Sequence, residues 1–409
     1  MDERMYWLAF SAFPGVGPVR FALLLSHFGS ARSAWEATTK DLLKINLGES
    51  LTVKFDSFRR SFDVAGYAKK LKDKEVGFLI LTDEKYPKLL KQISDPPFVL
   101  YVKGRNKSVN QKTQSIGQSV SQKNQIIRHS DISDLPKHRF TEFSESSENT
   151  DRHWDIAKAI AVVGTRKITN YGREVTQLLT KQLVLAGLTI VSGLAFGVDA
   201  AAHEAAIEAG GKTIAVLGCG VDCCNPRSNQ GLYDKIINGN GVVVSEMPLG
   251  HFALKGLFPA RNRIISGLSL GVLVTEGAFD SGALITASDA AAQGREVFAV
   301  PGPITSSLSK GPTELIKKGA KLVSTVEDIL EELKIKSTTS ITGTTSIMGR
   351  IDGTEEEKKI IQILENEPIG FDEIVRIISW PAAKVGSLLS IMEIKGMVKN
   401  TGNNVYKIV

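Results

Sequence analysis

Residues 160–166 read IAVVGTR and residues 188–199 read LTIVSGLAFGVD, and in each stretch an apolar run ends in a glycine-containing segment. Similar apolar runs follow at 213–217, 242–244, 271–274 and 297–300, separated by helix-like patterns such as 172–186 and 198–209. Fully apolar strands that alternate with helices are typical of a parallel sheet covered on both faces. The sequence therefore predicts an α/β fold, an extended, doubly wound, Rossmann-like parallel sheet, over residues 155–335.

Loops rich in glycine, serine, threonine and charged residues follow nearly every one of these strands. In an open parallel sheet such loops gather at the carboxyl edge, where ligands bind. Four arginines lie in or beside them: Arg166, Arg227, Arg261 and Arg263. Guanidinium groups bind phosphate bidentately, and glycines let main-chain N–H groups approach an anion. A groove of this kind without a recognition helix favours single-stranded nucleic acid held through its backbone.

Motifs for catalysis and for cofactors are absent from this edge. Arg166 stands where a dinucleotide-binding G-x-G-x-x-G needs its second glycine, and no G-x-x-x-x-G-K-[ST] occurs. Asp199 and His203, four residues apart on one helix face, are either an orienting carboxylate and its base or groups that hold the SGLAFGVD turn locally. We expect a binding protein rather than an enzyme, with no catalytic residue, cofactor or metal.

The composition is that of an ordinary globular protein. Its 409 residues carry a net charge of +6 and are 42% apolar and 23% charged. An acidic start (MDER) and the lack of any run of ~18 apolar residues favour a cytoplasmic protein with no membrane span. The three cysteines, at 219, 223 and 224, suit a reducing compartment and lack the paired spacing of a zinc site.

Two low-complexity segments divide the chain. Residues 106–154, rich in Ser, Thr, Asn and Gln, are predicted to be a disordered insertion, and residues 336–353 a flexible linker. The remaining pieces flank the sheet domain: an N-terminal helical domain (1–75), a lead-in to the sheet (76–105) and a C-terminal winged-helix domain (354–409).

Each flanking domain has one feature that can be interpreted in two ways. PGVGP at 14–18, between two apolar helices, resembles the turn of a helix-hairpin-helix module, which either contacts DNA or is only a turn. At the C-terminus, helices expected at 355–366, 371–378 and 382–395 precede a hairpin, the order of a winged helix. The charge of its recognition helix is modest, so both duplex DNA and a protein remain candidate ligands.

The motifs of the central domain, in their order, closely resemble the DNA-processing protein A (DprA/Smf) family over about 160–325. They read IAVVGTR, IVSGLAFGVDAAAH, GGKTIAVLGCGVD, NPRSN, VVSEMPLG, FPARNRIISGLS, TEGAFDSGALITA, GREVFAVPG and GPTELIKKGA. The resemblance implies an extended Rossmann fold behind a sterile-alpha-motif-like helical domain. It also implies a protein that binds and protects incoming single-stranded DNA and helps load the RecA recombinase in natural transformation. We expect a homodimer formed through the Rossmann-like domain.

The resemblance also implies which residues contact DNA. Arg166 of VGTR and Arg227 of NPRSN match the positions where the family contacts DNA phosphates. The other expected DNA-binding residues are Gly164, Thr165, Ser192, Gly193, Gly197, Asn229, Arg261, Asn262 and Arg263. The chain departs from the family pattern at Asn225, where a tyrosine is usual, and at Phe196, where a basic residue is common.

Two other functions are alternatives. A nucleoside-monophosphate phosphoribohydrolase shares this sheet and would use Glu276, but the glycine-rich phosphate loop of such enzymes is missing here. A transcriptional regulator would instead use the winged helix on duplex DNA.

Overall fold

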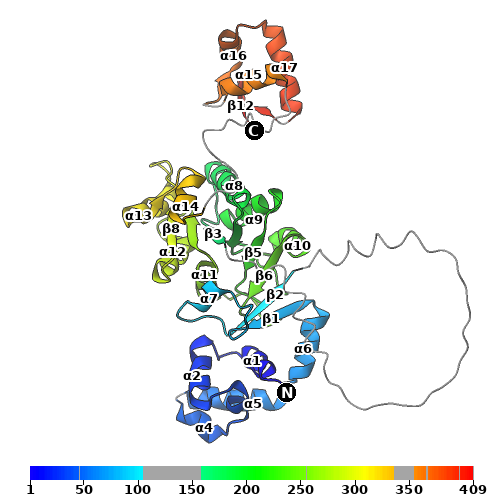
Figure 1. Ribbon diagram of the computed structural model, residues 1–409, viewed down its shortest axis with the longest axis vertical. Coiled ribbons are helices and arrows are strands. Elements are labelled where there is room, and N and C mark those ends of the chain that lie inside the picture. Colours follow the sequence, from blue (N-terminus) through cyan, green and yellow to red (C-terminus); the bar gives the residue numbers. More distant parts are fainter. Residues whose placement is uncertain are drawn as a thin grey trace, which may run out of the picture. The chain divides into compact units, whose positions relative to one another are not determined.

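A computed structural model describes residues 1–45, 47–104, 158–254, 256–335, 354–364, 367–395 and 397–408. The chain forms two compact units, Met1–Lys336 and Ser337–Val409 (Figure 1). The predicted insertion at 106–154 and the predicted linker at 336–353 lie outside the described residues.

The first unit is built on a nine-stranded sheet with the order β1-β2-β6-β5-β4-β3-β7-β8-β9. The strands are β1 Val76–Ile80, β2 Val99–Lys103, β3 Ala159–Val163, β4 Thr189–Ser192, β5 Thr213–Val216, β6 Gly241–Ser245, β7 Gly271–Val274, β8 Glu296–Ala299 and β9 Lys321–Leu322. The seven neighbouring strands β6, β5, β4, β3, β7, β8 and β9 are parallel, which confirms the predicted α/β sheet. Strands β3 to β8 are the six predicted apolar runs.

The lead-in adds a feature that the sequence did not predict, an antiparallel pair at one end of the sheet. β1 pairs with β2, and β2 pairs with β6, both antiparallel. Tyr101 lies opposite Ser245 at the end of β6, and Lys103 at the end of β2 lies opposite Val243, two residues nearer the start of β6. The carboxyl end of β2 therefore lies at the amino edge of the parallel strands, as does the start of β3.

Helices cover both faces of the sheet because side chains alternate along each strand. Val163 belongs to one buried cluster and Val162 to the other. The first face packs against α7 Lys88–Lys91, α11 Leu257–Gly267, α12 Gly282–Ala292 and α13 Lys310–Lys317. The second packs against α8 Asn170–Leu185, α9 Val198–Glu208, α10 Gln230–Asn238 and α14 Val326–Glu332. The described residues of this unit also include the short 3₁₀ helices η2 Arg227–Asn229 and η3 Ser307–Ser309.

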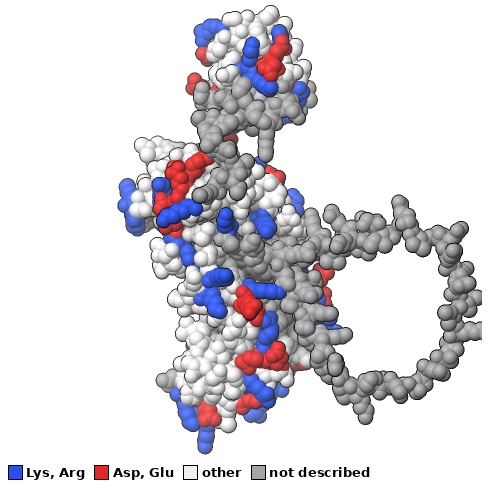
Figure 2. All heavy atoms as spheres, in the orientation of Figure 1, with Lys and Arg blue, Asp and Glu red and all other residues white. Residues whose placement is uncertain are grey.

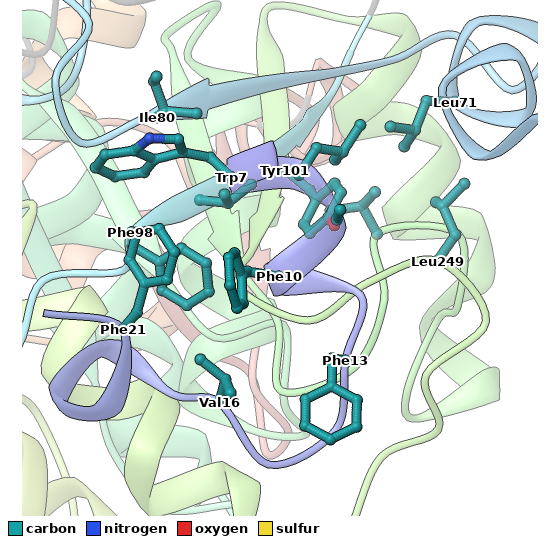
Figure 3. Close-up of a cluster of buried hydrophobic side chains, with 14 of the residues drawn as sticks. Trp7, Phe10, Phe13, Val16, Phe21, Leu71, Ile80, Phe98, Tyr101 and Leu249 are labelled. Atoms are coloured by element: carbon teal, nitrogen blue, oxygen red, sulfur yellow. The ribbon is translucent and has the colours of Figure 1, made fainter. Parts of the chain in front are cut away.

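The N-terminal helices pack directly on the antiparallel end of the sheet (Figure 3). They are α1 Glu3–Ser11, α2 Pro18–Phe28, α3 Ala31–Glu36, α4 Thr39–Lys44, α5 Glu49–Ser61 and α6 Val64–Asp73. The ring of Phe21 stacks on that of Phe98, with centroids 4.1 Å apart. The hydroxyl of the fully buried Tyr101 lies 2.6 Å from Ser11 Oγ. Residues 1–75 and the sheet therefore share one core.

The second unit has the predicted winged-helix order. It comprises α15 Glu355–Leu364, β10 Ile369–Gly370, α16 Phe371–Ile378, α17 Ala382–Ile394, β11 Val398–Asn400 and β12 Val405–Ile408. Its three-stranded antiparallel sheet has the order β10-β12-β11. Ile360, Ile374 and Leu389, one from each helix, are fully buried in its own core. β10 is an addition to the predicted elements.

Candidate nucleic-acid interface

Five loops follow β3 to β7 at the carboxyl edge of the sheet, and together we call them the rim: residues 164–169, 193–197, 217–229, 246–254 and 275–281. Strand β3 lies between β4 and β7, so consecutive connections leave it in opposite directions. Ligands of open α/β sheets bind at such a switch point. The loops after β3, β4 and β7 are therefore the centre of the candidate site.

The loops after β3 and β4 are in direct contact. The N–H of Val198 donates a hydrogen bond to the Thr165 carbonyl at 3.1 Å. Gly197 has φ +77°, and a Cβ added there would overlap the Thr165 oxygen and lie 2.9 Å from Arg166 Cα. Only glycine permits this approach, because an L-residue is strained at this φ and its Cβ has no space. The contact holds Phe196 next to Arg166 in the rim.

The loop after β5 is joined to the other side of the same β4 loop. Asn229 Nδ2 donates to the carbonyl oxygens of Leu194 and Ala195, at 3.0 and 3.3 Å. This places η2, and Arg227 within it, beside the 193–197 loop. The expected site residue Asn229 thus positions the loop through its own side chain.

Arg166 and Arg227 are exposed on the two sides of the 193–197 loop. The Arg166 guanidinium lies over the ring of Phe258, 5.4 Å from its centroid. Within the described ranges, neither arginine has a carboxylate partner. On the face drawn in Figure 2, basic and acidic side chains are interspersed without a large patch of one sign. Among the described residues, the guanidinium groups of Arg166 and Arg227 are therefore available to bind an anion at the rim.

Arg261 does not present its guanidinium to solvent, contrary to expectation. The side chain is only 6% exposed, and its Nη2 donates to the Gly193 carbonyl at 3.1 Å. A Cβ on Gly193 would overlap this guanidinium. Burial lowers the pKa of Arg261, while the nearby Asp199 opposes that shift. Arg261 therefore holds the β4 loop from inside the protein, through the Gly193 carbonyl, and does not present its guanidinium to a ligand.

Arg263 is also engaged inside the protein. Its Nη2 donates to Glu246 Oε2 at 2.5 Å, and its Nε lies 3.1 Å from Asp95 Oδ2. Burial raises the pKa of Glu246, and the adjacent Arg263 opposes this shift. Residues two positions apart on a helix point about 200° apart, so Arg261 and Arg263 of α11 face opposite sides. Asn262 between them donates from Nδ2 to the Gly282 carbonyl at 3.4 Å.

Several N–H groups expected to bind phosphate already have partners. Gly193 and Ala195 donate to Asp199 Oδ2, at 3.1 and 3.4 Å. Thr165 donates its N–H to the Glu276 carbonyl at 2.7 Å and accepts on Oγ1 from Lys167 N–H at 3.1 Å. The N–H groups of Gly193, Ala195 and Thr165 thus hydrogen-bond to other parts of the protein and join the loops. We therefore expect the exposed side chains to be the principal ligands of an anion.

Two further expected residues serve packing. Ser192 is buried, and its hydroxyl donates to the Val162 carbonyl on the neighbouring strand at 2.7 Å. Gly164 lies so close to the β7 loop and α9 that a Cβ would meet Glu276 O and Val198 Cγ2, each at 2.6 Å. Both residues fix the start of a rim loop, and the hydroxyl of Ser192 is already engaged within the sheet.

Asp199 holds the SGLAFGVD turn, as one of the two interpretations proposed. Burial raises its pKa, while Arg261 and the two N–H donors oppose that shift. His203 does not pair with Asp199: its Nδ1 lies 2.7 Å from Thr213 Oγ1. Burial lowers the pKa of His203 to about 3, so the ring is neutral at physiological pH. The alternative of a base oriented by Asp199 is therefore wrong.

Glu276, the residue a phosphoribohydrolase would require, is 2% exposed. Its carboxylate accepts hydrogen bonds from the N–H and the hydroxyl of Thr169, at 3.0 and 2.6 Å. Gly172 in the first turn of α8 packs against the same carboxylate. Glu276 thus joins the β7 loop to the start of α8 and is not presented to a substrate.

The cysteines beside the rim are free thiols. Burial raises the pKa of Cys219 to about 12 and that of Cys224 to about 11. In the part of the chain that the structure describes, no group of three or more His, Cys, Asp or Glu side chains is placed to hold a metal ion. Nor does any single helix in the described ranges have the length and apolar character to cross a membrane. Only α16 and α17 together do, and they are bent by 117°.

Two rim residues that the sequence did not single out are Phe252, in the loop after β6, and Phe279, in the loop after β7. Their side chains are 75% and 66% exposed. The sequence did contain a signal for them. Each phenylalanine lies in a glycine-containing loop after an apolar strand, where an aromatic side chain is not needed to form the core.

The winged helix carries few free cations on its predicted recognition helix. Lys384 Nζ lies 2.6 Å from Glu356 Oε1, and Lys395 Nζ lies 2.7 Å from Glu357 Oε1. Both carboxylates belong to α15. Because Lys384 of α17 and Lys395, directly after α17, are paired in this way, the charge of this helix is poorly suited to duplex phosphate.

Comparison with known proteins gives concordant matches. A sequence model of the family described as DNA recombination-mediator protein A matches residues 77–126 and 150–334, and one of the DprA winged helix domain matches residues 350–403. Protein Smf of Synechocystis sp. is 32% identical over 427 residues, covering 97% of this chain and 96% of that protein. DNA processing protein DprA of Bacillus subtilis is 38% identical over 262 residues, covering 64% of this chain and 73% of that protein. The X-ray structure of DNA processing protein A from Streptococcus pneumoniae is 32% identical with a TM-score of 0.60, covering 81% of this chain and 98% of that one.

Proposed function

The chain belongs to the DNA recombination-mediator protein A (DprA/Smf) family, and from that premise we propose that its rim binds single-stranded DNA. Arg166 and Arg227 hold phosphates on the two sides of the 193–197 loop. Arg261, Asp199 and Asn229 keep that loop in place. The observation that carries this proposal is a pair of exposed guanidinium groups that have no carboxylate partner among the described residues, on loops held by mutual contacts at the switch point of the sheet.

The proposal predicts salt-dependent and sequence-independent binding. Each phosphate contact to a single strand contributes about −0.7 to the slope of log K against log salt. The Arg166→Ala, Arg227→Ala double variant should therefore bind oligo(dT) more weakly and with a slope shallower by about 1.4. The matched control is Arg32→Ala, Arg60→Ala, which removes the same charge from exposed positions on α3 and α5.

The measurement is fluorescence anisotropy of a labelled oligo(dT) titrated at several salt concentrations. A rim variant that bound as tightly as the parent, with an unchanged slope, would show that the phosphate site lies elsewhere. A control variant weakened as much as the rim variant would mean that only net charge matters.

We further propose that the protein protects incoming strands and helps load RecA in natural transformation, acting as a homodimer in the cytoplasm. The family description as a recombination mediator supports the recombinase partner, and the free thiols suit a reducing compartment. The test is whether the purified protein accelerates RecA filament formation on strands coated with single-strand-binding protein. Analytical ultracentrifugation of the same preparation tests for the dimer.

We propose no catalytic function, cofactor or metal. The buried carboxylate of Glu276, which accepts hydrogen bonds from Thr169, argues against phosphoribohydrolase chemistry. Incubation with AMP should release no adenine. The paired lysines of α17 argue against a regulator that reads duplex DNA, and competition should favour single strands over duplexes.

A further inference from the structure

Exposed aromatic side chains gather at the rim. Within the described ranges, four Phe, Tyr and Trp residues are exposed: Phe196, Phe252 and Phe279 lie in rim loops, and Tyr171 lies in the first turn of α8. Tyr171 is held by its hydroxyl, which donates to the Pro301 carbonyl at 2.6 Å. The three phenylalanines have no polar group to explain their exposure. The residues Phe196, Phe252 and Phe279 are 47%, 75% and 66% exposed, respectively.

The order of the strands places the loops that carry these rings in alternation with the loops of Arg166 and Arg227. Along the sheet, β6, β5, β4, β3 and β7 are neighbours, and their loops carry one of these side chains each. The resulting order is Phe252, Arg227, Phe196, Arg166 and Phe279.

Contacts between successive loops support this order. Gly220 N–H donates to the His251 carbonyl at 2.9 Å, which joins the β5 and β6 loops next to Phe252. Asn229 joins the β5 loop to Ala195, and Gly197 packs on Arg166, so Phe196 lies between the two arginines. Thr165 N–H donates to the Glu276 carbonyl, which joins the β3 loop to the loop of Phe279.

We propose that this row binds the bases of a single strand as well as its phosphates. The phenylalanine rings are stacking platforms for bases, and the arginines between them hold the phosphates. The inference rests on the proposed function and names the second half of the same site. The loops of Phe252, Phe196 and Phe279 follow alternate strands of the sheet, and the loop between each two of them carries an arginine.

A single strand suits this surface because it offers both bases and phosphates. Bases of every sequence have apolar faces, and stacking on aromatic side chains is common in sequence-tolerant single-strand binding. Each nucleotide also carries a phosphate, so Arg166 and Arg227 on the two sides of the Phe196 loop each have an anion to bind. Duplex DNA has its bases stacked internally and cannot offer them to Phe196. The row therefore gives a physical basis for selecting single strands.

The decisive experiment separates bases from phosphates. The parent, Phe196→Ala and Phe196→Trp are titrated with a dT 12-mer and with an abasic strand of equal phosphate number. Stacking is lost on truncation to alanine, so Phe196→Ala should bind the dT strand roughly 5- to 150-fold more weakly. Binding to the abasic strand and the salt slope should stay as in the parent, because both arginines remain.

Phe196→Trp should keep the affinity for dT, and its added fluorescence should be quenched by dT and not by the abasic strand. Leu178→Ala, which truncates another exposed apolar side chain, on α8, is the matched control and should bind both strands as the parent does. Phe279→Ala should have the smallest effect of the three rings, because the exposed Asp280 beside it repels phosphate.

Each contrary result has its own meaning. A parent that binds neither strand refutes the proposed function. A parent that binds the dT and abasic strands equally, or a Phe196→Ala variant that loses affinity for both alike, overturns the stacking row and leaves the phosphate site standing. A Phe252→Ala, Phe279→Ala variant that turns a dimer into a monomer in sedimentation assigns those two rings to an interface between copies and likewise overturns the row.

Discussion

Gly197 offers a quantitative test of how the rim is assembled. Its φ of +77° strains any L-residue, at a cost of about 1–2 kcal/mol. Alanine there also places a Cβ against the Thr165 oxygen and 2.9 Å from Arg166 Cα. These are backbone atoms and cannot rotate away, so overpacking adds about 1–3 kcal/mol. Gly197→Ala should therefore lower the free energy of unfolding by about 2–5 kcal/mol.

Gly187 is the matched control. It has φ +86°, and nothing lies within 4 Å of the position of an added Cβ. Gly187→Ala therefore incurs the φ strain alone, about 1–2 kcal/mol. Urea unfolding of the two variants and the parent, with unchanged m values, measures the difference.

The same pair separates stability from binding. Gly197→Ala must push the β4 loop away from Arg166, so oligo(dT) binding should weaken about 10-fold, the value of roughly one charge-assisted hydrogen bond. Gly187→Ala should bind as the parent does. If Gly197→Ala were no less stable than Gly187→Ala and bound the oligonucleotide normally, the contact between these two loops would not organise the site.

Two further predictions concern other parts of the molecule. His203 has its pKa lowered to about 3 by burial. The unfolded chain therefore takes up a proton below about pH 6.5 that the native state does not, and stability falls as the pH decreases. From pH 8 to pH 5, the protonation of His203 in the unfolded chain should lower the free energy of unfolding by about 2 kcal/mol. Urea unfolding of His203→Asn at several pH values should lack this part of the pH dependence. A variant whose stability depends on pH as strongly as that of the parent would assign the dependence to other groups. In the winged helix, the Glu356→Gln, Glu357→Gln double variant frees Lys384 and Lys395 from their ion pairs. The slope of log K against log salt for duplex binding should then become steeper by about 0.9 per lysine. An unchanged slope would mean that α17 does not face the duplex.

Much of the fold could be predicted because its signals are local. Apolar runs such as 160–163 and 271–274 are uninterrupted, and glycine or a charged residue ends each of them. The antiparallel strands β1 and β2 were expected only as a lead-in, because their pairing with each other and with β6 depends on residues far apart in the chain.

The site was predicted in position and only partly in detail. Arg166 and Arg227 are exposed in the rim as expected, and their contact with DNA stays a prediction. Arg261 and Arg263 turn inward, because their partners are Gly193 on one side and Glu246 on the other. Nothing local distinguishes a buried arginine from an exposed one when the groups that bind it come from other strands.

The direction of β2 has a practical consequence. Lys103 is the last residue of β2 and Ala159 is the first residue of β3. Both lie at the amino edge of the parallel strands, the edge of the sheet opposite the rim. A reporter domain spliced between these two ends would be tethered twice to a rigid framework, without its attachment points touching the path of a bound strand. Pairs of labelled molecules built in this way could report assembly on one oligonucleotide by energy transfer, with every rim residue left native.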